Sequence, residues 1–160
     1  MIVDFEGQRV EGKLNASIEA AMHIEVYKAC KKVNAIVHAH PVFCSVIAVS
    51  GLEIPAIIDE QVTYIGREIK VAEYALPGSR ELARNVVSAL WSRNAVILAN
   101  HGALSVGRDL SEALTICELL ENTARIYICA LGLGKVHPPP AEVAELEKAF
   151  FASIYGEGEG

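Results

Sequence analysis

The sequence has few aromatic residues and an excess of acidic over basic ones. Phe, Trp and Tyr make up 6% of the 160 residues, so the core must be built mainly from aliphatic side chains. There are 14 Lys and Arg against 20 Asp and Glu, which gives a formal net charge of -6. Nucleic-acid-binding proteins are expected to carry a basic patch, whereas these basic residues are scattered. The composition therefore argues against a nucleic-acid partner.

Long apolar runs and paired cysteines are also lacking. Charges or prolines interrupt every apolar run before it reaches the roughly 18 residues that a membrane span needs, and Asp4 follows Met1 too closely for an apolar signal core. The four cysteines form no Cys-x-x-Cys pair, and we interpret them as buried, reduced thiols rather than as a disulfide framework. We therefore expect no membrane association and a cytoplasmic location.

The sequence does contain enough apolar residues for one core. Hydrophobic residues make up 52% and charged residues 21% of the chain, as in a globular protein. We predict a single domain over 1–154 and a disordered Gly/Glu tail over 155–160. Apolar periodicity and turn residues predict helices near 17–32, 42–49, 80–92, 110–130 and 141–154. They predict strands near 1–12, 33–40, 69–74, 95–101 and 103–106, with a strand or extended loop over 54–66.

Two histidines at the end of an apolar run suggest a metal site. His38 and His40 follow 33–37, and residues two apart on a strand point to the same face, so both imidazoles can share one ion. His101 follows a second apolar run, 95–99. Three histidines around zinc leave a fourth position open, as in catalytic sites. We predict that His38, His40 and His101 bind one divalent metal, zinc or another.

The other histidines do not share this pattern. A lone histidine in an apolar strand is more often a hydrogen-bonded residue than a ligand. His23 and His137 have no partner at i+2, so we do not predict them as ligands. A catalytic metal also needs a proton carrier, and Glu19, in the first turn of the helix before the His38 strand, is the candidate. A glutamate there also gains about 0.3–1 kcal/mol from the helix dipole without any catalytic role.

The order of five short segments resembles the class II aldolase/adducin family, and within it the fuculose-phosphate aldolase branch. The resemblance covers nearly the whole chain and rests on these segments: Ser17-Ile18-Glu19, His38-Ala39-His40-Pro41, Ile54-Pro55-Ala56, Leu76-Pro77-Gly78-Ser79-Arg80-Glu81-Leu82 and Asn100-His101-Gly102.

The resemblance implies a fold, a site and an assembly. The fold would be α/β, a three-layer α/β/α sandwich with a mainly antiparallel central sheet. His38, His40 and His101 would bind zinc, Glu19 would be the acid/base, and Ser17 would contact substrate. Family members usually form cyclic homotetramers with active sites between subunits.

The sequence departs from the family pattern in three places. Relatives carry an upstream glycine-asparagine loop that holds phosphate, and Met1 stands after it. Ile18 replaces a serine that contacts phosphate. The family's tyrosine after Ile-Pro-Ala is replaced near Asp59, and Tyr64 is the nearest phenol. We expect weakened phosphate recognition.

These observations lead to one function with alternatives. We predict a zinc-dependent aldehyde-lyase that cleaves a ketose or ketose 1-phosphate. A pentulose-phosphate 4-epimerase or related dehydratase is the enzymatic alternative, although epimerases commonly carry aspartate in place of the acid/base glutamate, so Glu19 favours the aldolase. A catalytically inactive, adducin-like interaction module is the alternative from another class.

Overall fold

The computed structural model describes residues 1–156. Its strands are β1 (Ile2–Val3), β2 (Arg9–Glu11), β3 (Ala35–Ala39), β4 (Val71–Ala72), β5 (Ala95–Leu98) and β6 (Gly102–Gly107). Its helices are α1 (Ala20–Ala29), α2 (Val42–Ser50), α3 (Asp59–Tyr64), α4 (Arg80–Leu90), α5 (Leu110–Gly132) and α6 (Ala141–Tyr155). None of the helices in this part of the chain is both long enough and apolar enough to cross a membrane.

Four strands form the central sheet, in the order β3-β6-β5-β4. The β3–β6 and β5–β6 pairs are antiparallel, and the β4–β5 pair is parallel. The predicted mainly antiparallel sheet is confirmed. In the β3–β6 pair, His38 lies opposite Leu104 and Ala39 opposite Ala103. This register places the end of β3 beside the start of β6.

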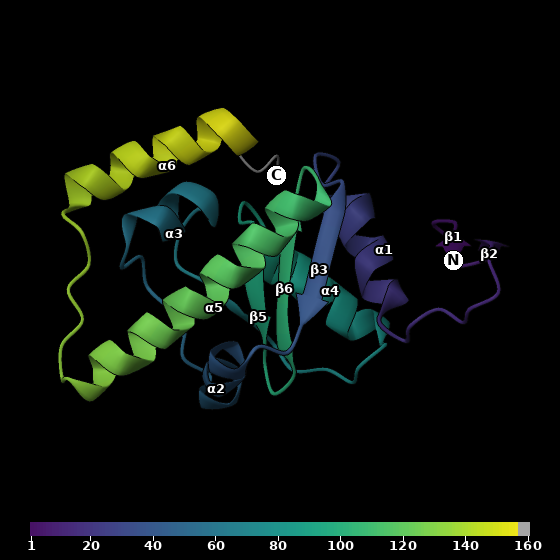
Figure 1. The fold of residues 1–160 in the computed structure, drawn as a ribbon, viewed down its shortest axis with the longest axis horizontal. Helices are drawn as coiled ribbons and strands as arrows, with labels where there is room; N and C mark the ends of the chain where they lie inside the picture. Colours follow the sequence, from purple (N-terminus) through teal and green to yellow (C-terminus); the bar gives the residue numbers. More distant parts are fainter. Residues whose placement is uncertain (157–160) are drawn as a thin grey trace.

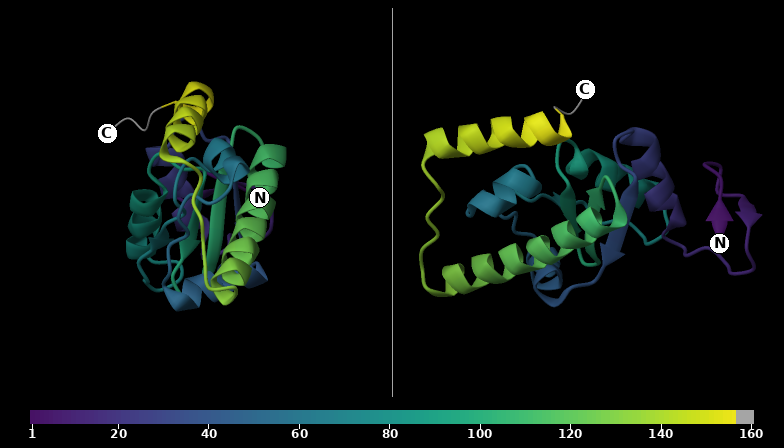
Figure 2. Two further views of the ribbon diagram at one scale, coloured as in Figure 1. Left: turned by 90° about the vertical axis from the view of Figure 1, so that its left-hand side faces the viewer. Right: turned by 45° about the horizontal axis from the view of Figure 1, so that its top comes forward.

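Helices cover both faces of the sheet, which confirms the predicted three-layer sandwich (Figures 1 and 2). Side chains alternate along β5 as the period of a strand requires. Val96 and Leu98 pack with α1 and α4 on one face, and Ala95 and Ile97 pack with α2 and α5 on the other. The two layers of the core are therefore separated by the sheet and are built largely from aliphatic residues, as the composition predicts.

Local signals account for several helix ends. Ser79 caps α4, because its Oγ accepts a hydrogen bond of 3.0 Å from the Leu82 N–H. Asp109 caps α5 in the same way through the Glu112 N–H. The Glu112 carboxylate accepts from the Arg108 N–H, so only half of a capping box forms there.

Two predicted elements are wrong in detail. The first helix begins at Ala20 and ends at Ala29, shorter than 17–32, because the Ser17 carbonyl and hydroxyl form a separate turn that ends at Ala20. The segment 54–66, predicted as a strand or extended loop, contains α3. Buried Gln61 stabilises that helix and its loop, since its amide donates to the Pro55 carbonyl and accepts from the Ile57 N–H.

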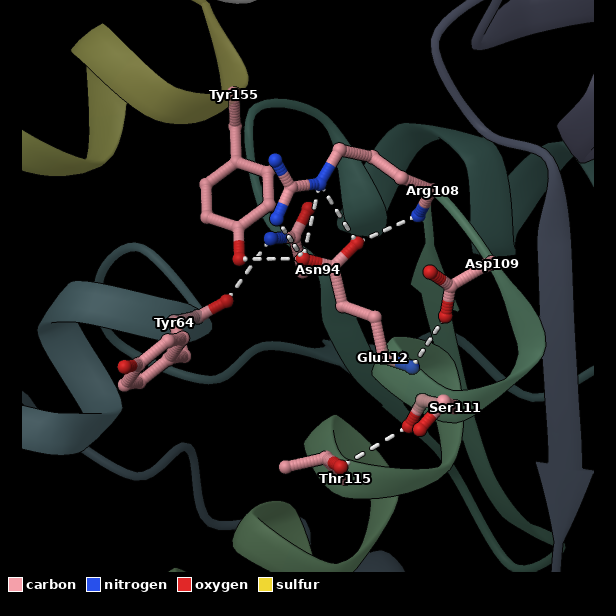
Figure 3. Close-up of polar contacts among 8 residues, drawn as sticks. All are labelled: Tyr64, Asn94, Arg108, Asp109, Ser111, Glu112, Thr115 and Tyr155. Atoms are coloured by element: carbon pink, nitrogen blue, oxygen red, sulfur yellow. Dashed lines mark hydrogen bonds and ion pairs between the residues drawn. The ribbon is translucent and has the colours of Figure 1, made fainter.

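The chain ends lie at the margins of the sandwich. The β1–β2 hairpin stands beside α1 at one end of the molecule, and α6 runs along α3 (Figures 1 and 2). Tyr155 belongs to α6 and not to a disordered tail. Its hydroxyl donates to the Glu112 carboxylate, which also accepts from the Arg108 guanidinium (Figure 3). Residues 157–160, the rest of the predicted tail, lie outside the described residues.

Candidate metal centre and active site

His38 and His40 lie where β3 ends. His38 is on the strand, and His40 follows its last residue. Pro41 comes next, with φ of -66° and extended ψ of 150°, and α2 begins at Val42. Proline suits this position because it has no N–H to donate and its fixed φ prepares the first turn of a helix. The chain therefore leaves the strand at His40 and enters α2 two residues later.

His101 lies in a tight turn, not on a strand as predicted. β5 ends at Leu98 and β6 begins at Gly102. Asn100 between them has φ of 54°, a left-handed conformation that asparagine tolerates better than most residues, and it interrupts the extended backbone. The His101 N–H donates to the Leu98 carbonyl and closes the turn. The turn still places the third imidazole beside the end of β3.

Gly102 allows the two histidine segments to come close. A Cβ at this position would lie 2.6 Å from the Ala39 carbonyl oxygen and would also overlap the His40 ring. Contacts this short do not occur between a real Cβ and its neighbours, so only glycine fits without movement. Glycine at this position therefore leaves room for His40.

The three imidazoles converge on one point. Their ring centroids are 5.0, 5.0 and 5.1 Å apart, and the candidate ligand atoms all lie within 4.8 Å of one another. The His38 and His40 Nε2 atoms are 3.3 Å apart. Two nitrogens at the usual Zn–N distance of about 2.0–2.1 Å in a tetrahedral site would be separated by roughly 3.3 Å. The residues present therefore fit a zinc ion.

Hydrogen bonding and burial prepare His38 as a ligand. Its Nδ1 lies 2.9 Å from the Ala103 carbonyl oxygen. Nδ1 must donate there, because a carbonyl only accepts, so Nε2 of a neutral ring is left with a free lone pair. Burial lowers the pKa of His38, and the neighbouring His101 and His40 add to this effect. At neutral pH the ring is therefore uncharged, as metal binding requires.

One ring nitrogen of His101, Nδ1, is buried without a hydrogen bond among residues 1–156. Buried polar atoms of folded proteins nearly always have one. His23 and His137 lie outside this group of candidate ligands.

Glu19 lies at the start of α1, next to the metal candidates. It is 9% exposed, and its Oε2 is buried with no partner among the described residues. Its charge acts to raise the pKa of both His38 and His23, against the stronger lowering by burial, and all three residues line one cavity. The Glu19 N–H donates to the Ser17 Oγ at 3.2 Å. This contact holds the Ser17 hydroxyl at the backbone of Glu19.

A cavity of about 1100 Å³ connects these groups. Ser17, Glu19 and His38 line it together with residues 3–6, which include the end of β1. Cavities of roughly 300–1,000 Å³ are typical of small-molecule sites. The structure thus places the predicted acid/base and the predicted substrate contact in one cavity with a predicted metal ligand.

Comparison with known proteins identifies the family. The family model described as Class II Aldolase and Adducin N-terminal domain matches residues 1–128. The chain belongs to the class II aldolase and adducin family.

Individual relatives of this class II aldolase family member are sugar-phosphate aldolases by name. The chain is 31% identical over 151 residues to the 5-deoxy-D-ribulose 1-phosphate aldolase of Bacillus thuringiensis serovar kurstaki, covering 94% of this chain and 70% of that protein. It is 34% identical over 133 residues to the L-fuculose phosphate aldolase of Escherichia coli K12, covering 83% of this chain and 61% of that protein.

Solved structures show the same similarity. A structure named L-fuculose 1-phosphate aldolase superposes with a TM-score of 0.87 at 37% identity, over 92% of this chain and 69% of the other. The enzyme of the same name from Thermus thermophilus superposes with a TM-score of 0.73 at 28% identity, over 88% of this chain and 73% of the other.

One residue considered from the family pattern does not lie at this site. Tyr64 ends α3, and its carbonyl accepts a hydrogen bond from the side chain of Asn94, just before β5 begins (Figure 3). His101 follows the opposite end of β5, and Tyr64 is not among the residues that line the cavity. Tyr64 therefore lies away from the cavity that Ser17, Glu19 and His38 line in this chain.

Proposed function

We propose that this chain is a zinc-dependent aldehyde-lyase that cleaves a ketose 1-phosphate or ketose into a dihydroxyacetone-type fragment and an aldehyde. The observation that carries the proposal is the position of Glu19, near His38 in a cavity beside three converging imidazoles. The names of the relatives, fuculose-phosphate and deoxyribulose-phosphate aldolases, support the same reaction class.

The residues of the site divide the chemistry between them. When bound, zinc supplies Lewis-acid stabilisation of the negative charge that develops on substrate oxygen as the carbon–carbon bond breaks. His38, His40 and His101 would hold the ion. Glu19 would accept the proton of the substrate hydroxyl and return a proton to the carbon released by cleavage. Ser17, fixed by its contact with Glu19, would hydrogen-bond the substrate.

We further propose that the chain acts in the cytoplasm as a homotetramer with active sites between subunits. In support, Val42, Val46 and Val49 are spaced along one side of α2 and are 69%, 43% and 66% exposed. A stripe of exposed apolar residues marks an association surface, and α2 begins two residues after His40. Unpaired Cys30, among the free thiols of the chain, suits a reducing compartment.

The site residues support the alternative functions less well. An adducin-like interaction module has no need for a buried carboxylate beside three clustered histidines. A pentulose-phosphate 4-epimerase or dehydratase remains the enzymatic alternative, and it is distinguished by its product.

A direct assay tests the proposal. Zinc-loaded protein should release dihydroxyacetone phosphate from fuculose 1-phosphate or 5-deoxyribulose 1-phosphate, and Glu19→Gln should lower turnover by about 10²–10⁴-fold while zinc stays bound. Glu25→Gln is the matched control, since Glu25 lies on the same helix and pairs with Lys28 on the surface. Full activity of Glu19→Gln, or an epimerised product without cleavage, would contradict the proposal.

A further inference from the structure

Helix α2 connects the two segments that carry the metal candidates. Its first residue, Val42, is two residues from His40. Near its other end, the Ala48 carbonyl accepts a hydrogen bond of 3.0 Å from the N–H of Asn100, the residue before His101. A shift of α2 would therefore move His40 relative to the His101 turn, and the 5.1 Å separation of these two rings depends on where the helix lies.

The amino end of α2 has no cap of its own. Pro41 occupies the capping position and offers no side-chain acceptor. The first N–H groups of a helix have no partner within the helix and need one from elsewhere. Glu121 of α5 provides it, since its Oε1 accepts from the Phe43 N–H at 2.9 Å and its Oε2 from the Cys44 N–H at 2.8 Å. The negative charge also suits the positive end of the helix dipole.

Helix α5 is in turn fixed to the central sheet. The buried hydroxyl of Ser105, on β6, donates to the Ala113 carbonyl of α5 at 2.7 Å. One turn beyond Glu121, the Arg125 guanidinium lies 5.6 Å from the centre of the Phe43 ring, within the range of a cation–π contact. A continuous path of contacts thus runs from β6 through α5 to the first turn of α2.

We propose that Glu121 is a positioning residue of the metal centre: by binding two N–H groups of α2, it sets the place of His40 relative to His101. The inference rests on the proposed function only in that the three histidines bind a metal. Glutamine has nearly the same shape but cannot replace the carboxylate, because its NH₂ group would face one of the two N–H donors. The resulting unsatisfied donor favours a displaced first turn of α2.

The test compares Glu121→Gln with Glu118→Gln. Glu118 is exposed, lies three residues earlier on α5 and has no side-chain hydrogen bond among the described residues, so both changes remove one negative charge from nearly the same place. Zinc dissociation constants come from competition with a chromophoric chelator, and the melting temperature of the metal-free protein is measured in parallel. We expect Glu121→Gln to bind zinc about tenfold more weakly than wild type, and Glu118→Gln to stay within about twofold of wild type.

The outcomes separate positioning from stability. Zinc affinity of Glu121→Gln equal to that of Glu118→Gln overturns the proposal, even if melting temperature falls. If Glu121→Gln does not fold, Arg125→Gln removes the second contact from an exposed position, and weaker zinc binding is expected while wild-type affinity overturns the proposal. Failure of wild type to bind zinc overturns it as well. Absence of lyase activity with the zinc result intact refutes the proposed function alone.

Discussion

Replacing Gly102 by alanine should damage the metal centre more than the fold. The backbone of Gly102 is ordinary β-strand, so alanine meets no conformational barrier, and the restricted unfolded chain even favours it by about 0.4–1 kcal/mol. The cost is steric, because the new Cβ would lie 2.6 Å from the Ala39 carbonyl oxygen and against the His40 ring.

The size of the effect follows from these distances. Relieving the contact with Ala39 requires a shift of about 0.5 Å or more, and such overpacking typically costs about 1–3 kcal/mol. Metal–ligand distances tolerate only about 0.2 Å. The required shift exceeds that tolerance, so His40 should lose its place in the ligand set. We expect zinc affinity to fall by about 100-fold, with a net loss of about 1–2 kcal/mol in the unfolding free energy of metal-free protein.

Gly132→Ala is the matched control. Gly132 ends α5, and a Cβ there would meet nothing within 4 Å, so this change should leave zinc affinity unaltered and stability unchanged or slightly raised. Chelator competition measures the zinc affinity of both variants, and urea unfolding measures their stability. If Gly102→Ala binds zinc as tightly as wild type, the close approach of Gly102 to His40 does not constrain the metal centre.

Three further predictions concern His40, Ile18 and His23. His40→Ala should abolish tight zinc binding, whereas His137→Ala, outside the cluster, should not; equal zinc content by elemental analysis would refute the assignment. Ile18→Ser restores a hydroxyl that the family uses to contact phosphate. It should lower the KM for fuculose 1-phosphate about tenfold, because a charge-assisted hydrogen bond contributes roughly 1.5 kcal/mol. An unchanged KM in steady-state kinetics would count against phosphate binding beside Ser17. Burial lowers the pKa of His23 from its ordinary value of 6.5, so the unfolded chain binds the proton more tightly than the folded protein does. The free energy of unfolding should therefore fall as the pH drops below 6.5. Urea unfolding at pH 7.5 and 5.5 should show a smaller fall for His23→Gln than for wild type.

Nearby residues determined much of the fold and part of the site. The i, i+2 spacing of His38 and His40 needs only the two-residue period of a strand to bring both rings to one face. Pro41 starts α2, and Gly51 ends it with φ of 68°. Asp109 starts the longest helix by capping it. These features depend on contacts within a few residues, which is why they can be predicted from the sequence.

Only the tertiary structure determined how the segments meet. Gln61 forms α3 by bonding loop carbonyls on both sides of itself, a pattern that apolar periodicity does not reveal. In the sequence, Glu121 is indistinguishable from the other polar residues of a long helix. Its hydrogen bonds to Phe43 and Cys44 join residues that are 78 and 77 positions apart. The approach of Gly102 to His40 depends on the register of β3 with β6. Such contacts follow from how distant segments pack, and the local spacing of residues does not predict that packing.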